Sequence, residues 1–157
     1  MNIIGGTKPF SNFNPNYNQT VIQYEYLDSE YSILFSEKTG LVENNKNIWL
    51  HPPRTHDAGI LQLSAFPYLK FEKTKKWTWK LEASYENYKN LNLVHEYIKE
   101  ENVIYGNLNC IQINAETRSE AGSTSSKFIF NDSTGFLLME FKNLDKTQIK
   151  LELVFDN

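Results

Sequence analysis

The sequence predicts a mainly β fold: an antiparallel curved sheet, half-open barrel or sandwich of about nine or ten strands, with little helix. Three observations predict it. Aromatic residues make up 14% of the chain, and flat or β-branched side chains suit a pleated, half-buried surface. Apolar and polar residues alternate in most segments. Short turns separate these segments, which is typical of antiparallel pairing because parallel strands need long crossovers.

The first strands are predicted between residues 21 and 50. Residues 21–27 alternate apolar and polar side chains, which indicates a strand with one solvated face. Residues 31–35 form the second expected strand. Residues 48–50 form a short one that ends before Pro52, because proline cannot donate to a ladder.

Residues 54–75 are the least regular part, and 60–66 fit either a strand or one short helix. Trp77 and Trp79 then fall on one face of a clearly alternating segment, which predicts a strand. Residues 85–93 contain three asparagines, which are poor helix formers. We expect a long loop there.

From residue 94 onward the alternation becomes regular. A connection at 131–135 that contains glycine predicts a hairpin between its flanking strands. The strands expected in this part of the chain are residues 95–104, 108–117, 127–130, 136–141 and 148–155.

The length of 157 residues predicts one domain. We expect residues 19–157 to fold as that single antiparallel β domain. Residues 1–18 are rich in Asn, Gly, Pro and Ser without a strand or helix period, so they are expected to be a flexible leader. Such a leader suits a lipid-anchored tether, and an ordinary disordered terminus is the alternative.

Charge and cysteine content exclude several classes. The net charge of −3 and pI near 5.6 argue against nucleic-acid binding, which usually requires a basic face. The chain contains no run of about 18 apolar residues, so the sequence predicts no transmembrane segment. Cys110 is the only cysteine, so the sequence predicts no intrachain disulfide and no cysteine-based metal site.

One segment concentrates polar chemistry: His51, Arg54, His56 and Asp57 lie close together in the sequence. Two imidazoles and a carboxylate can hold a metal or form an acid–base group. The third histidine, His95, lies on a distant strand, so no third ligand has a fixed spacing and we predict no metal. The alternatives are a proline-stiffened polar loop and a loop that contacts a partner.

No enzyme signature is present. The sequence contains no HExxH spacing, no GxSxG elbow in a strand–turn–helix context and no glycine motif that cradles phosphate. Cys110 lies in the middle of a predicted strand, where a small buried cysteine is usual. We therefore expect a non-catalytic protein without a cofactor.

Three tryptophans are candidates for a binding surface. Trp49, Trp77 and Trp79 can line one apolar surface with the aromatic residues of the first strands. On a curved sheet that is not fully covered, such a surface binds an acyl chain or apolar residues of a partner. The alternative is that the rings fill the core.

The C-terminal part carries strand and turn positions in a recognisable order: Tyr97, Val103, Gly106-Asn107-Leu108, Cys110, Ile111, Ala115, Phe128, Phe130, Gly135-Phe136-Leu137, Met139, Leu151 and Leu153. Through them, residues 94–155 resemble the curved sheet of lipoprotein carriers of the LolA/LolB type and related uncharacterised bacterial envelope proteins. The resemblance implies a curved antiparallel sheet and an envelope location. The carriers' covering helices have no counterpart here, and no functional residue is carried over.

The sequence thus predicts a non-catalytic binding protein of a bacterial cell envelope or periplasm, which binds a protein partner or an apolar ligand. A cytoplasmic location is expected if the chain is the complete native product. One alternative is an immunity protein that neutralises a bacterial toxin by direct binding. Another is a hydrolase or metal protein centred on residues 51–57. The binding residues we predict are Trp49, His51, Arg54, His56, Asp57, Trp77 and Trp79.

Overall fold

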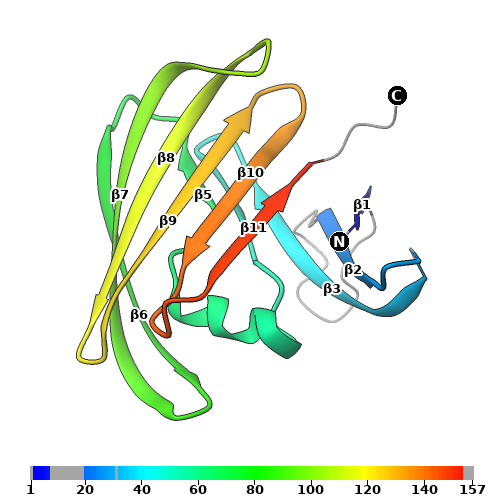
Figure 1. The fold of residues 1–157 in the computed structure, drawn as a ribbon. Helices are drawn as coiled ribbons and strands as arrows, with labels where there is room; N and C mark the ends of the chain where they lie inside the picture. The colour runs from blue at the N-terminus through cyan, green and yellow to red at the C-terminus, as the bar shows by residue number, and fades with distance from the viewer. Residues whose placement is uncertain (1, 8–19, 31, 154–157) are drawn as a thin grey trace.

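The computed structural model describes residues 2–7, 20–30 and 32–153, and for residues 2–7, 20, 27, 56 and 57 it describes the backbone alone. Most of the described residues are in strands (Figure 1), which confirms the mainly β prediction. The elements are β1 (Asn2–Thr7), β2 (Thr20–Leu27), β3 (Ile33–Glu43), β4 (Asn47–Leu50), the 3₁₀ helix η1 (His56–Leu63), β5 (Tyr68–Lys70), β6 (Lys76–Tyr85), β7 (Tyr88–Tyr105), β8 (Leu108–Ser119), β9 (Gly122–Asn131), β10 (Gly135–Lys142) and β11 (Gln148–Glu152).

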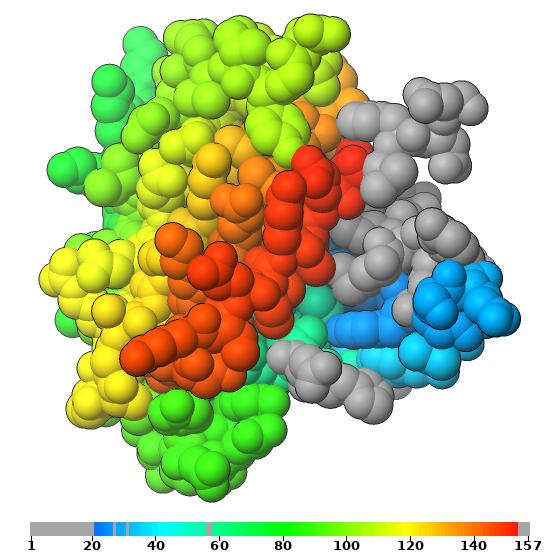
Figure 2. All heavy atoms as spheres, viewed as in Figure 1, coloured from blue at the N-terminus to red at the C-terminus, as the bar shows by residue number. Residues whose placement is uncertain are grey.

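The strands form two antiparallel sheets in which neighbours follow one another along the chain. The first sheet has the order β1-β2-β3-β4-β5 and the second the order β11-β10-β9-β8-β7-β6. The second sheet is long and strongly curved, and β5 lies on its concave side (Figure 1). Its outer face is a continuous surface of side chains from β7 to β11 (Figure 2). Of the three predicted architectures, the chain therefore adopts a curved sheet packed on a second sheet.

The concave side of the large sheet is filled by β4 and β5. Ile48 and Leu50 of β4 and Leu69 of β5 are 5%, 2% and 0% exposed and belong to the main core. Successive side chains of a strand point to opposite faces. Trp49 and Tyr68 therefore face the other way, and there they contact rings of β6 and β7. Both faces of this two-stranded ladder thus contact other elements, and Trp49 and Tyr68 are half-buried.

The predicted loop at residues 85–93 is wrong, because the chain makes a tight hairpin there. β6 ends at Tyr85 and β7 starts at Tyr88, so the segment is a turn followed by strand. Glu86 adopts a φ of 48°, which closes the turn. Leu93 is 1% exposed and packs in a small cluster with η1. This burial outweighs the poor intrinsic preference of the asparagines.

Two further segments differ from or extend the sequence predictions. Residues 60–66 were open between strand and helix, and most of them belong to η1. Part of the predicted leader, residues 2–7, is β1, which pairs with β2. The remaining leader residues, 8–18, lie outside the described residues. No helix in the described part is long and apolar enough to cross a membrane.

Candidate functional site

An aromatic groove lies between the β4–β5 ladder and β6. Trp49 and Tyr68 contribute from β4 and β5, and Trp79 contributes from β6, all three being half-buried. The polar residues of the groove are Asn47, Lys70 and Thr78. Its volume is about 330 Å³, and it is open to solvent. We refer to the surface formed by these six residues as the aromatic groove.

Edge-to-face ring contacts fix the shape of the aromatic groove. The ring centroids of Trp49 and Trp79 are 6.0 Å apart, and those of Tyr68 and Trp79 are 5.7 Å apart. Trp77 is 7% exposed and stacks on Tyr97 at 5.2 Å, so it lies beneath the groove and not in its wall. Such pairs add stability beyond the area that they bury, which holds the groove in one shape.

His51 supports the groove from one side. Its ring lies 4.7 Å from Trp49 and 5.3 Å from Phe66, both edge to face. Burial, with a smaller contribution from the Arg54 charge, lowers the pKa of His51 to about 4. The imidazole is therefore neutral at pH 7 and acts as a packing ring. Its backbone carbonyl accepts the Tyr24 hydroxyl at 3.1 Å, which ties β2 to the end of β4.

His95 supports the groove from below. It is 0% exposed, and its Nδ1 lies 2.7 Å from the Thr117 hydroxyl on β8. Its Nε2 has no partner among the described residues. Burial lowers the pKa of His95 to about 4. Phe66 lies near both histidines, with its ring centroid 6.2 Å from that of His95.

The structure brings together only some of the predicted site residues. Trp49, His51 and Trp79 form one continuous ring cluster, and Trp77 joins it through Tyr68. Arg54 is exposed, and its backbone N–H donates to the Glu37 carboxylate at 2.6 Å. His56 and Asp57 begin η1, and their side chains lie outside what the structure describes.

This placement does not support an acid–base or metal site in residues 51–57. His51 is packed among aromatic rings while Arg54 faces solvent, so these two do not converge on a common point. Among the described residues no three His, Cys, Asp or Glu side chains are grouped to hold a metal ion.

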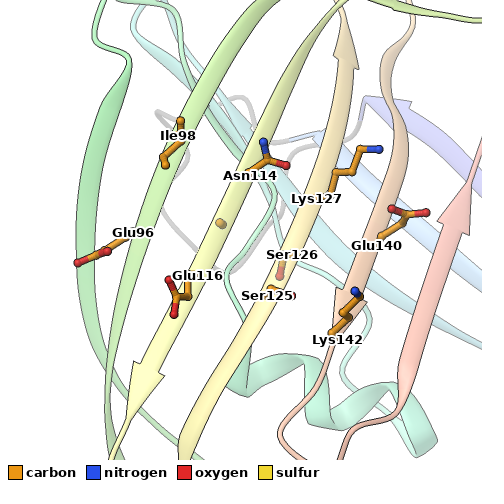
Figure 3. A pocket seen from close by; sticks show the side chains of 10 residues that line it. Glu96, Ile98, Asn114, Glu116, Ser125, Ser126, Lys127, Glu140 and Lys142 are labelled. Atoms are coloured by element: carbon orange, nitrogen blue, oxygen red, sulfur yellow. The ribbon is translucent and has the colours of Figure 1, made fainter.

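A second hollow of about 380 Å³ lies on the solvent face of the large sheet. Figure 3 shows Glu96 and Glu116 on one side of it and Lys127 and Lys142 on the other. Both glutamates already pair with Arg118, at 3.6 and 3.1 Å. Paired, solvent-exposed charges on a sheet face give little binding energy, so the aromatic groove is the stronger candidate.

The sequence did not predict Phe66, Tyr68 or Lys70 as site residues, and it placed His95 on a strand distant from residues 51–57 without fixing its position. The hairpin between β6 and β7 places His95 directly opposite Trp79. The alternation of Leu91 and Leu93 with asparagines was the sequence signal that a strand begins there. Tyr68 follows a proline in a three-residue strand, and such a short segment carries no period that indicates a strand.

Comparisons with known proteins give no family: no family model matches the chain, and no curated protein or solved structure matches it significantly.

Proposed function

We propose that the chain is a non-catalytic binding protein that holds a protein partner in the aromatic groove. The observation that carries this proposal is the half-buried set of Trp49, Tyr68 and Trp79 around an open groove with a polar rim. Tryptophan and tyrosine are enriched in protein interfaces, because each combines a large apolar area with a polar group.

A protein partner is favoured over an acyl chain. A carrier for acyl chains needs an apolar cavity on the concave side of its sheet. Here β4 and β5 occupy that side, with Leu69 0% exposed and Trp77 7% exposed. The groove that remains is open and carries Asn47 and Lys70, which suits the mixed surface of a polypeptide.

The test is selection from a phage-displayed library of random peptides of about twelve residues, with the intact chain as bait. Thr78 and Ser125 are exposed residues in the two hollows. Thr78→Arg blocks the aromatic groove, and Ser125→Arg blocks the hollow on the sheet face. We expect selected peptides to bind the wild type and Ser125→Arg equally and to lose affinity for Thr78→Arg by about tenfold or more. Peptides that lose affinity only for Ser125→Arg, or a selection that recovers none, overturn the proposal.

The bacterial envelope location belongs to the same proposal and rests on the sequence. Fractionation of native cells with an antibody against the chain tests it. Recovery in the cytoplasmic fraction overturns the location and leaves the binding role standing.

A further inference from the structure

We propose that the partner supplies an acidic extended segment, which adds to β6 as a new strand and inserts an apolar side chain between Trp49 and Trp79. This proposal rests on the proposed function and names the chemistry of the partner. Three features carry it: an unpaired strand edge, its position beside the aromatic groove, and the charge around it.

The edge is open along the first half of β6. Among the described residues β6 pairs only with β7, so its other side carries backbone groups without a ladder partner. η1 packs against the second half of the strand, where Tyr85 lies against Gly59. Residues 76–80 are therefore the part of the edge that a partner strand can reach.

The phase of the ladder shows which backbone groups face outward. The N–H of Lys99 donates to the carbonyl of Lys75 at 2.8 Å, just before β6 begins. In an antiparallel ladder, residues that bond to the neighbour alternate with residues that do not. Odd-numbered residues of this part of β6 therefore bond to β7. The backbone N–H and C=O groups of Lys76, Thr78 and Lys80 point to the open edge.

The aromatic groove adjoins this edge. Thr78 and Trp79 of β6 line it together with Trp49 and Tyr68. A strand added to β6 lies about 4.8 Å from it, and alternate side chains of that strand point toward the rings. Peptides added to a sheet edge gain affinity from backbone hydrogen bonds and specificity from such side-chain sites.

The charge around the edge is positive, although the whole chain has a net charge of −3. Residues 70–80 contain one acidic side chain, Glu72, and five lysines: Lys70, Lys73, Lys75, Lys76 and Lys80. All of these lysines are exposed except Lys70, which is half-buried and lines the groove.

Two carboxylates near this segment are already paired. Glu101 lies 3.0 Å from Lys99, and Glu96 lies 3.6 Å from Arg118. Glu82, farther along β6, is exposed. The charges of Lys73 and Lys75 also act on Glu101, whereas Lys70, Lys76 and Lys80 make no ion pair among the described residues. An acidic segment therefore complements these three lysines at the groove and the open edge.

The same charges disfavour pairing with a second copy of the chain. If two β6 strands paired antiparallel about Thr78, Lys76 of one copy would oppose Lys80 of the other. Like charges directly opposite each other in a ladder are destabilising. Lysines on an edge strand also oppose edge-to-edge aggregation, and here they leave the edge open to an acidic strand.

The experiment measures binding of a synthetic peptide, Glu-Val-Glu-Trp-Glu-Val-Glu, by fluorescence anisotropy of an attached dye. Thr78→Pro removes an N–H that faces the open edge without removing a bond to β7. Thr78→Val is the matched control, which keeps the N–H. We expect Thr78→Pro to bind the peptide about tenfold more weakly than Thr78→Val, because both variants lose the hydroxyl and only Thr78→Pro loses the N–H. The double variant Lys76→Glu/Lys80→Glu should abolish binding, and added salt should weaken it.

Three matched probes complete the test. The same peptide with lysine for glutamate should not bind, and one with N-methylated alternate amides should bind at least about tenfold more weakly. This N-methyl arm keeps the proposal testable if Thr78→Pro does not fold. A short oligothymidylate that binds more tightly than the acidic peptide overturns the proposal in favour of nucleic acid.

The failure of this inference differs from the failure of the proposed function. If library-selected peptides are sensitive to Thr78→Arg but indifferent to Thr78→Pro and to the charge reversal, the groove binds proteins without strand addition. The inference is then wrong and the proposed function stands. If no peptide binds the groove, both are wrong.

Discussion

Trp79 and His95 lie directly opposite each other on β6 and β7, and their rings meet at 69° with centroids 6.4 Å apart. The pair connects the aromatic groove to the buried interior, because His95 bonds to Thr117 on the next strand. A charged imidazolium at this position would lie under the groove without solvent. The packing of Trp79 and His95 beneath the groove therefore requires that His95 is neutral.

The first prediction is that the fold loses stability in mild acid. The pKa of His95 is lowered to about 4 in the folded chain, against its usual 6.5. Between these values the unfolded chain binds more protons, so the free energy of unfolding falls as pH drops through this window. The shift corresponds to about 3 kcal/mol at most for His95. His51 contributes in the same direction, by less because it is only half-buried.

Urea unfolding between about pH 4.5 and about pH 7.5 measures this effect. His95→Gln removes the titrating ring and keeps a hydrogen-bonding group near Thr117. We expect the variant to show a clearly flatter pH dependence, whatever its absolute stability. Equal slopes for variant and wild type would mean that His95 is not the group that titrates.

A second prediction concerns Lys99, whose side chain is 2% exposed. Its Nζ donates to the backbone carbonyls of Glu72 at 2.6 Å and Lys70 at 3.3 Å, which fastens the β5–β6 connection to β7. Lys99→Met removes both bonds and leaves these carbonyls without the donor. We expect a loss of about 2 kcal/mol in unfolding free energy.

Glu101→Gln is the control for Lys99. It removes the ion pair at 3.0 Å, but the Glu101 side chain is 52% exposed, so the loss should stay within about 0.5 kcal/mol. Thermal or urea unfolding of both variants decides the matter. A larger loss for Glu101→Gln than for Lys99→Met would show that the ion pair, and not the bonds to the carbonyls, fastens the connection.

The third prediction tests the β9–β10 turn. The Asn131 side-chain oxygen accepts from the N–H groups of Ser133 and Thr134, at 3.0 and 3.2 Å, and its amide donates to the Asn109 carbonyl at 3.0 Å. Asn131→Ala loses all of these bonds and should cost about 1 to 2 kcal/mol. Asn131→Asp keeps the acceptor and should lose less. Equal losses in urea unfolding would show that the bond to Asn109 dominates.

The hairpin that encloses this turn was predictable, because Gly135 ends a five-residue polar connection between two alternating segments. Gly135 adopts a φ of 81°, which a glycine allows at little cost. The β6–β7 hairpin was missed, because its turn contains no glycine and Glu86 takes the left-handed conformation instead. In that case buried Leu91 and Leu93 decide the structure, and their burial depends on η1, which is distant in the sequence.

In the site, too, local sequence predicts some features, and contacts between distant segments determine the others. Trp49, Trp77 and Trp79 were predictable as candidates from residue type alone. Which of them faces solvent was not, because alternation puts Trp77 and Trp79 on one face while only Trp79 borders the open groove. That difference depends on where β5 lies. The open edge of β6 likewise follows from the sheet order, which the sequence does not specify.

The last prediction tests the charge of the groove without a partner. The chain has three tryptophans. Trp77 is 7% exposed, whereas Trp49 and Trp79 are half-buried in the groove wall. Because lysines surround this groove, iodide should quench the tryptophan fluorescence more strongly than caesium at equal ionic strength. Lys76→Glu/Lys80→Glu should reverse that order, and Trp77→Phe should raise the quenched fraction, because it removes the emission of the shielded ring. Equal quenching by both ions in the wild type would contradict a positive potential at the groove.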